Sequence, residues 1–429
     1  MLDLKYIREN AEAVQKNCEN RGVEADVSLV VELADRRSAL IQELNDLRQE
    51  QNRMAKSIGQ ERDTEARQRL IEGSRGMKDR IPELEAELRQ TEDRLRDEQL
   101  KIPNVTHPDS PIGKDDTENV EIRRWGDIPS FDFEPKDHVE LGEKLGIIDF
   151  DAGAKVTGSK FYFLRGDAVL LEMALTRYVL DVIMERGYEP TITPDLARDE
   201  ALVGTGFIPR GPETQIYSVA DSDLSLIATA EITLAGQLAD EILDADQLPL
   251  RYAGISHCFR TEAGSHGRAS RGLYRVHQFT KVEMFAFTTP EQSEGIHAEM
   301  VEIEERIFQG LGLPYRVVDI CTGDLGGAAY RKYDLEAWMP GRGQNGEFGE
   351  VTSTSNTTDY QARRLKIRYR PEGGRPQLLH TLNGTALAMS RALIALIEVY
   401  QQEDGSVKVP DALVSYLGKE RLEPAGTRG

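Results

Sequence analysis

Residues 256–287, SHCFRTEAGSHGRASRGLYRVHQFTKVEMFAF, decide how this chain folds. Two runs of alternating apolar and polar residues, 250–261 and 273–287, flank a polar middle. This pattern predicts two antiparallel strands joined by a long loop. Alternation assigns one face of the second strand to the core, with Val276, Val282, Met284 and Ala286. The opposite face carries Arg275, His277, Phe279, Lys281 and Glu283.

The second face of this strand has the dimensions of a nucleotide site. Arg275 and Glu283 are each four residues from Phe279, or about 14 Å at ~3.4 Å per residue. On the first strand, Arg260 and Glu262 share a face by the same parity. Mixed charges at alternating positions are also ordinary on a solvated sheet face. Alternation alone therefore favours a solvated surface, and the residue order has to decide between the two interpretations.

The residue order resembles motif 2 of the class II aminoacyl-tRNA synthetases, specifically the seryl enzymes. The resemblance rests on Phe259-Arg260-Thr261-Glu262, Arg271-Gly272-Leu273, His277-Gln278-Phe279 and Lys281-Val282-Glu283. A combination of this length is far more specific than a short pattern. It implies an α+β fold, in which a class II catalytic domain is built on an antiparallel β-sheet flanked by helices.

Composition limits the class of protein. A length of 429 residues with 39% hydrophobic residues indicates two to three domains with a sizeable core. No apolar run approaches the ~20 residues of a membrane span, and the N-terminus lacks a signal-peptide pattern. We therefore expect a cytoplasmic protein without a membrane partner. Cys18, Cys258 and Cys321 are far apart and contain no CxxC, so they indicate small buried hydrophobes.

The net charge of −21 is unevenly spread. Residues 28–102 contain 15 Lys/Arg and 17 Asp/Glu, so they contribute only −2. Acidity elsewhere disfavours nonspecific DNA binding, because phosphate contacts require cations. A shaped RNA that is met by local arginines remains compatible with this distribution.

Residues 28–102 have the apolar periodicity of two heptad helices. Leu33, Leu40, Leu47 and Met54 recur every seven residues, and Leu84, Leu88 and Leu95 belong to the second series. The polar segment 59–64 between them predicts an antiparallel two-helix coiled-coil hairpin. Gly73, Gly76 and Pro82 predict a bend or break in the second helix. Before the hairpin, Asp3 is expected to cap a short helix, and a turn follows at Gly22.

Such a hairpin can be a spacer or an oligomerisation device. The family resemblance instead implies an arm that grips the long variable arm of tRNA(Ser). The candidate phosphate contacts are Arg48, Arg53, Lys56, Arg62, Arg67, Arg69 and Arg75. We therefore expect an N-terminal tRNA-binding domain at 1–103, a Pro-, Asp- and Gly-rich linker at 104–117 and a catalytic domain at 118–429.

Motifs 1 and 3 also have counterparts. Residues 169–194, an amphipathic helix followed by a strand, resemble motif 1, which forms the homodimer interface in this class. Residues 378–398 resemble motif 3, a strand that leads into an apolar helix carrying Arg391. A buried guanidinium requires a partner, and the resemblance offers the ATP triphosphate in place of a structural ion pair. Motif 2 spans 250–287.

Two further segments are candidates for substrate contacts. Thr229-Ala230-Glu231 could be an ordinary helix start, and the resemblance instead implies a serine-binding TxE. Glu350-Val351-Thr352-Ser353 resembles the ATP-binding segment of the family, in which Glu350 and Ser353 offer the hard oxygens that Mg²⁺ prefers. Residues 341–346 match GxGxxG, but they follow Met339-Pro340 rather than a strand, and no helix pattern opens after them, so we discount a Rossmann site.

The resemblance implies serine activation by ATP and transfer of serine to the 3′ end of tRNA(Ser), and to tRNA(Sec) where that tRNA exists. It implies that Arg260 bridges the α-phosphate and the serine carboxylate, with Glu262 reading adenine and Phe279 stacking on it. Arg275 and Arg391 would hold the distal phosphates, and Glu283 with Thr385 would receive serine. The ATP-binding set also includes Thr261 and Val276.

Two rival functions remain open from the sequence. A paralogue that loads a small amino acid onto a carrier protein would lack the long helical arm. A non-catalytic coiled-coil protein would be expected to have lost arginines, whereas Arg260, Arg275 and Arg391 are all present.

Overall fold

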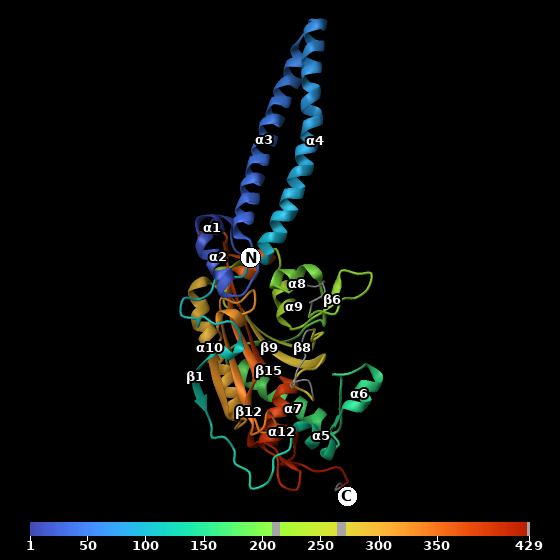
Figure 1. Cartoon of the computed structure of the whole chain (residues 1–429), viewed down its shortest axis with the longest axis vertical. Coiled ribbons are helices and arrows are strands. Elements are labelled where there is room, and N and C mark those ends of the chain that lie inside the picture. Colours follow the sequence, from blue (N-terminus) through green and yellow to red (C-terminus); the bar gives the residue numbers. More distant parts are fainter. Residues whose placement is uncertain (208–214, 264–271, 427–429) are drawn as a thin grey trace. The chain divides into compact units, whose positions relative to one another are not determined.

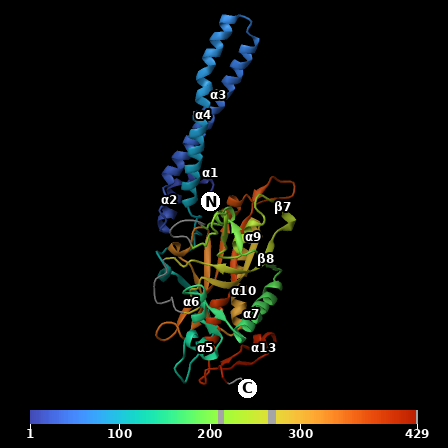
Figure 2. The ribbon, with the colours of Figure 1, turned by 90° about the vertical axis from the view of Figure 1, so that its right-hand side faces the viewer.

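The computed structural model describes residues 1–207, 215–263 and 272–426, and for Arg75 it describes only the backbone. The chain forms two compact units, Met1–Val105 and Thr106–Gly429 (Figures 1 and 2). The linker expected at 104–117 stays a prediction. Within the described residues, no helix is both long and apolar enough to cross a bilayer.

The first unit is helical. It consists of α1 (Leu4–Glu9), α2 (Ala11–Asn20), α3 (Val27–Gln60) and α4 (Thr64–Lys101). The expected cap is confirmed, because the Asp3 carboxylate accepts hydrogen bonds from the backbone N–H groups of Lys5 and Tyr6. Helices α3 and α4 run side by side as a long hairpin (Figure 1). Leu40, Leu44 and Leu84 are buried in the seam between them, as the heptads predict.

The predicted break in the second helix is wrong, whereas a bend stays a prediction. Helix α4 is continuous through Gly73, Gly76 and Pro82. Ile81 and Leu88 flank the proline and pack into the seam around Leu84. Ion pairs also join the two helices on both sides of this position, namely Arg80–Glu43 at 3.2 Å before it and Arg48–Glu85 at 2.7 Å after it. Packing along the hairpin therefore outweighs the local cost of the proline.

The second unit is built on a mixed sheet with helices. Its helices are α5 (His138–Leu145), α6 (Phe150–Val156), α7 (Asp167–Met184), α8 (Asp199–Thr205), α9 (Glu231–Gly236), α10 (Ser293–Gly310), α11 (Tyr360–Leu365), α12 (Met389–Val399) and α13 (Asp411–Leu417). The strands of the main sheet are β1 (Val120–Trp125), β4 (Glu189–Ile192), β8 (Leu250–Phe259), β9 (Gln278–Thr288), β10 (Tyr315–Asp319), β11 (Arg331–Met339), β12 (Glu347–Thr358) and β15 (His380–Ala388). The short strands are β2 (Ile148–Asp149), β3 (Phe163–Leu164), β5 (Leu196–Arg198), β6 (Leu224–Leu226), β7 (Ile242–Asp244), β13 (Arg368–Arg370), β14 (Gln377–Leu378), β16 (Val407–Lys408) and β17 (Arg421–Leu422).

In the described residues, the main sheet has the strand order β1-β10-β11-β12-β15-β9-β8-β4. Its neighbouring strands are antiparallel except for β4, which pairs parallel to β8. The predicted hairpin is present as β8 and β9, with Gly254 opposite Glu283 and Cys258 opposite Phe279. The second strand begins at Gln278, later than predicted, because residues 273–277 form a turn followed by irregular, bent backbone. The first strand ends at Phe259, so Arg260 and Glu262 follow it.

Strand β9 separates two cores. Val282, Met284 and Ala286 pack in a cluster with residues of α7, α10 and α12. Phe285 and Phe287, on the opposite face, pack with Ala230 before α9, with Leu234 of α9 and with residues of α11. The expected alternation is therefore confirmed, but both faces become buried toward the end of the strand. Phe279, Lys281 and Glu283 share the α9 face, where the strand is not covered by this second core.

Candidate functional site

A cavity of about 220 Å³ lies on this face of β9, and its lining includes most of the residues predicted from the sequence. The predicted residues that line it are Thr229, Glu231, Arg260, Glu262, Arg275, Val276, Phe279, Glu283, Glu350, Val351, Thr352, Ser353, Thr385 and Arg391. Thr261 and Ala230 do not line it. Residues 264–271, which include Arg271, lie outside the described residues.

One end of the cavity combines an aromatic ring with cations. The Arg260 guanidinium lies 5.3 Å from the centre of the Phe279 ring. Glu262 has a left-handed backbone, with φ of +51°, and its carboxylate pairs with Arg275 at 3.3 Å. The turn after β8 therefore brings Glu262 and Arg275 together, although neither belongs to a strand. An aromatic face with adjacent guanidinium groups is suited to a base and its phosphates.

Arg391 enters the cavity from the first turn of α12. Its guanidinium contacts the Glu350 carboxylate at 3.0 Å and donates to the Glu350 backbone carbonyl at 3.0 Å. Burial alone would lower the pKa of Arg391, but the attraction of Glu350 outweighs it, and the pKa lies above its usual value. The structural ion pair considered for this arginine thus exists. Because Glu350 is 43% exposed on its side chain, Arg391 still faces accessible space.

A β-bulge explains why four consecutive residues of β12 line the cavity. Leu335 pairs with Thr352 and Glu336 with Glu350, which leaves Val351 without a partner in the ladder. Thr352 is 1% exposed, and its hydroxyl donates to the buried Glu304 carboxyl of α10 at 2.8 Å. The hydroxyl of Thr354 contacts the same carboxyl. The Thr352 hydroxyl therefore helps to hold β12 against α10, and its contact with ATP stays a prediction.

A second, more buried end of the cavity is rich in carboxyl groups. Glu283 is 2% exposed, pairs with Lys281 at 2.5 Å and accepts a hydrogen bond from Thr385 at 3.2 Å. Thr385 lies directly opposite Glu283 in the β15–β9 ladder, so the register sets this contact. The pair is small, buried and polar, which suits a compact hydroxyl and an ammonium group.

Glu231, at the start of α9, completes this end. Its carboxylate accepts hydrogen bonds from Gln361 at 2.6 Å and from Asn383 at 2.9 Å. Burial, followed by repulsion from Glu283, raises the pKa of Glu231 to about 7. Thr229 accepts the Glu231 backbone N–H at 3.3 Å and so shapes the start of the helix. A carboxyl group with this pKa is sensitive to a neighbouring cation.

The protein side chains at the cavity could supply only part of the coordination of a magnesium ion. The described residues contain no group of three or more His, Cys, Asp or Glu side chains that could hold a metal ion. Glu350 and Ser353 offer oxygens at the cavity wall. Mg²⁺ commonly takes one or two carboxylates together with substrate phosphates and waters. The donor set therefore fits a metal that arrives with a nucleotide.

Several cavity residues were not assigned from the sequence. They are Phe207, Tyr274, Lys281, Asn383, Ala388 and Ser390. Lys281 had a detectable signal, because it shares the face of Phe279 and Glu283 by parity. Asn383 follows the same logic on β15. The Rossmann interpretation of 341–346 was rightly discounted, although one reason was wrong, because the segment does follow a strand. It is the hairpin connection between β11 and β12.

Comparison with known proteins covers both units. A model described as the tRNA synthetase class II core domain (G, H, P, S and T) matches residues 217–400, and the seryl-tRNA synthetase N-terminal domain matches residues 1–106. A serine–tRNA ligase of Rubrobacter xylanophilus is 74% identical, over 99% of this chain and 100% of its own length.

Solved structures agree with these matches. A seryl-tRNA synthetase from Pyrococcus horikoshii, complexed with ATP, has a TM-score of 0.91 and 43% identity, over 99% of this chain and 100% of that chain. A cytoplasmic serine–tRNA ligase from Naegleria fowleri, in complex with AMP, has a TM-score of 0.85 and 34% identity, over 99% of each chain.

Proposed function

The chain belongs to the seryl-tRNA synthetase family, a family of ATP-dependent aminoacyl-tRNA ligases, and from this premise we propose how its cavity works. It activates L-serine with ATP to seryl-adenylate, and the chain then transfers serine to the 3′ end of tRNA(Ser). The observation that carries this proposal is that one cavity is lined by two groups of side chains, an aromatic ring with three arginines and a buried pair of carboxyl groups beside Thr385. The first group suits ATP and the second suits serine.

The first step joins two anions, so charge neutralisation and positioning dominate it. An oxygen of the serine carboxylate attacks the α-phosphorus, and the bond to the bridging oxygen of pyrophosphate breaks. Arg260 would lie between the carboxylate and the α-phosphate. Arg275 and Arg391 would hold the leaving phosphates. Bound Mg²⁺ would supply further positive charge to the phosphates, with Glu350 and Ser353 as its protein ligands.

The adenine end relies on Phe279 and Glu262, with Thr261, Val276 and Val351 as backbone neighbours. We propose that Phe279 stacks on the base and that Glu262 accepts from its amino group. The serine end uses Thr229, Ala230 and Glu231 together with Glu283 and Thr385. Alanine would leave the buried Glu283 and Thr385 without the hydroxyl partner that serine provides, which penalises alanine.

The acceptor is bound, in this proposal, by the helical hairpin of the first unit, which contacts the long variable arm of tRNA(Ser). We also propose that tRNA(Sec), where the cell contains it, is charged with serine by the same route, and that the reaction takes place in the cytoplasm. Aminoacylation of the two transcripts in parallel tests the acceptor range.

We propose that the chain works as a homodimer through α7 and β4. Met173 of α7 and Ile192 of β4 are 63% and 83% exposed, which is unusual for apolar side chains in regular structure. Burial against a second copy would remove this surface from water. Sedimentation equilibrium over a range of protein concentrations measures the association.

The decisive experiment is amino-acid-dependent ATP–pyrophosphate exchange with magnesium, in the wild-type chain and in Arg391→Ala. We expect exchange with serine alone, and a loss of about 100-fold or more in the variant, since removing one charge-stabilising donor typically costs 10²–10³ in rate. Arg331→Ala is the matched control. This half-buried arginine pairs with Asp319 at 2.8 Å and lies over Tyr333, and it does not line the cavity. Exchange with another amino acid would overturn the substrate, and no exchange at all would overturn the activation step.

A further inference from the structure

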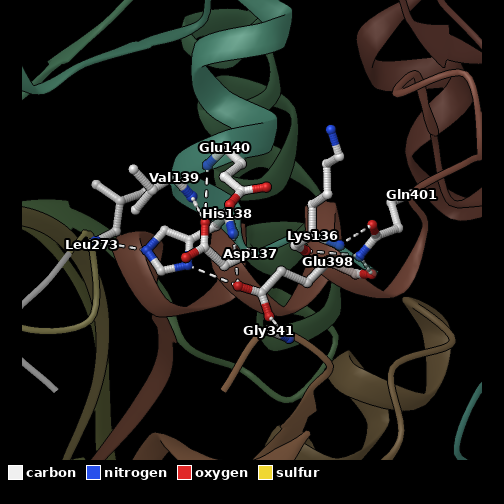
Figure 3. A network of polar contacts seen from close by, with 9 residues as sticks. All are labelled: Lys136, Asp137, His138, Val139, Glu140, Leu273, Gly341, Glu398 and Gln401. Carbon is white, nitrogen blue, oxygen red and sulfur yellow. Dashed lines mark hydrogen bonds and ion pairs between the residues drawn. The ribbon is translucent and has the colours of Figure 1, made fainter. Parts of the chain in front are cut away.

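A polar network outside the cavity joins four separate segments of the second unit (Figure 3). His138, at the start of α5, contacts the Glu398 carboxylate of α12 through Nδ1 at 2.8 Å. The backbone N–H of Leu273 donates to His138 Nε2 at 3.0 Å. The backbone N–H of Gly341, in the β11–β12 connection, donates to Glu398 at 2.8 Å.

The hydrogen bonds fix the tautomer of His138. A backbone N–H can only donate, so Nε2 must accept from Leu273 and cannot carry a proton. Nδ1 therefore carries the proton and donates it to Glu398. The backbone N–H of His138 also donates to Glu398 at 2.9 Å. Glu398 is only 1% exposed. It accepts hydrogen bonds from three N–H groups, two of His138 and one of Gly341, and these bonds compensate for the loss of water around its carboxylate.

Two glycine residues let the backbone approach His138 and Glu398 closely. A Cβ added at Gly272, which has φ of +79°, would lie 2.0 Å from His138 Nε2. A Cβ at Gly341 would lie 2.6 Å from the Asp137 Cα and 3.0 Å from a Glu398 carboxylate oxygen. Glycine is therefore required where the backbone approaches both members of the pair.

One anchored backbone group directly precedes cavity residues, and the other precedes a residue that packs on one of them. Leu273 is followed by Tyr274 and Arg275, which line the cavity. Gly341 is followed by Arg342, whose guanidinium lies 4.2 Å from the centre of the Tyr274 ring. Arg391 lies 4.7 Å from the same ring and directs its Nε toward the Tyr274 carbonyl at 3.4 Å. The network thus fixes the segment that places Arg275 and supports Arg391.

We propose that His138 and Glu398 are positioning residues for ATP, which hold Leu273–Arg275 so that Arg275 and Arg391 meet the distal phosphates. This inference rests on the proposed function of the cavity. It does not involve the serine end, where Thr229, Glu231 and Glu283 have other partners. A network with a purely structural role would change stability and would leave the ratio of the two substrate constants unaltered.

Two substitutions at His138 separate the two hydrogen bonds of its imidazole ring, the one to Glu398 and the one from Leu273. Asparagine places its amide near the position of Nδ1, so His138→Asn keeps a donor to Glu398 and loses the acceptor for Leu273. Glutamine extends further, so His138→Gln offers an oxygen to the Leu273 N–H and loses the link to Glu398. Pyrophosphate exchange gives KM for ATP, KM for serine and kcat for each variant.

We expect His138→Asn to raise KM for ATP about tenfold, which corresponds to ~1.4 kcal/mol, with KM for serine within about twofold of wild type. His138→Gln should lie closer to wild type in KM for ATP. Equal KM values for ATP in all three proteins, or a parallel rise for both substrates, would overturn the proposal. His380→Asn is the control, since this half-buried histidine contacts Ser293 at 2.9 Å through Nδ1 and does not line the cavity.

A second variant keeps the proposal testable if the His138 variants do not fold, and a second measurement keeps it testable if the chain catalyses no exchange. Glu398→Gln keeps the volume and one acceptor oxygen, and it should show the same selective effect on ATP. Calorimetric titration with ATP in the absence of serine reports binding without catalysis. Weaker ATP binding in the folded variants supports the positioning role even where wild type catalyses no exchange, and unchanged binding contradicts it.

Discussion

The ionisation of Glu231 should control serine binding. With a pKa raised to about 7, this carboxyl is mostly protonated at pH 6 and mostly ionised at pH 8, and its ionised fraction rises about tenfold over that interval. The serine ammonium prefers the anion. We therefore expect KM for serine to fall by up to about tenfold between pH 6 and pH 8, at saturating ATP.

The Glu231→Gln variant is the control for this prediction. It should bind serine more weakly than wild type at pH 8, and its KM should lose the dependence on pH near 7. A wild-type KM that stays flat or rises across this interval would show that the carboxyl does not meet the ammonium.

The residues that the sequence did not assign share a physical reason. Glu304 is 1% exposed and accepts hydrogen bonds from two threonines of β12. In the sequence, however, an acidic residue within the amphipathic pattern of α10 indicates an ordinary exposed position. Gln361 supports Glu231 from α11, more than 100 residues away, and only tertiary folding brings them together. Contacts of this kind leave no local periodicity, whereas Phe279 and Glu283 share a strand and could be paired by parity.

At the scale of elements, the close approach of α9 to β8 places the serine end. A Cβ added at Gly254 would lie 2.7 Å from the Ala230 Cβ and 2.8 Å from Leu234 Cδ1. Gly254→Ala should push the start of α9, with Thr229 and Glu231, away from the strand. We expect KM for serine to rise about tenfold and stability to fall by ~1–3 kcal/mol, as for overpacked cores. KM for ATP should change little.

Gly295→Ala is the matched control for this element. Gly295 lies in α10, and an added Cβ would have no neighbour within 4 Å. The change should stabilise the helix slightly, because alanine has the higher helix propensity. Thermal unfolding and exchange kinetics of the two variants test the comparison, and an unchanged serine KM in Gly254→Ala would contradict it.

Element types followed from the sequence better than element ends did. The heptads and the β8–β9 alternation are confirmed, because each repeats over many residues. The strand predicted from 273 begins at 278, since the His138 and Arg391 contacts bend the preceding segment. Pro82 lies inside a continuous helix because packing against α3 compensates its cost. Non-local contacts decided both exceptions.

At the scale of the whole molecule, the distribution of charge bears on RNA binding. The chain has a net charge of −21, and residues 28–102 contribute only −2 of it. Some of the candidate phosphate contacts in the hairpin are engaged, since Arg48 pairs with Glu85 at 2.7 Å, Arg53 with Glu50 at 2.5 Å and Arg69 with Glu65 at 3.7 Å. The side chain of Arg75 lies outside the described residues.

Lys56, Arg62 and Arg67 are exposed near the turn between α3 and α4, and they are the cations we expect to meet RNA phosphates. Replacing all three by alanine should lower kcat/KM for tRNA at least about 10-fold, and about 100-fold at low salt, where charge interactions are strongest. Serine-dependent exchange should stay unchanged. The slope of log(kcat/KM) against log[salt] should also become shallower by about 2–3 units, since each lost phosphate contact removes nearly one.

A matched triple variant separates location from charge. Arg36 and Arg37 of α3 pair with Glu87 and Glu92 of α4, and Arg80 of α4 pairs with Glu43 of α3, so replacement of these three arginines by alanine removes the same charge from the same hairpin. Exposed pairs contribute little stability, and we expect this variant to fold and to charge tRNA within about threefold of wild type. If the two triples weaken charging equally, the tip cations are not the contact and the hairpin acts through its overall charge. If serine-dependent pyrophosphate exchange falls as well, the hairpin influences the catalytic unit. The assignment of tRNA binding to the first unit and serine activation to the second would then be wrong.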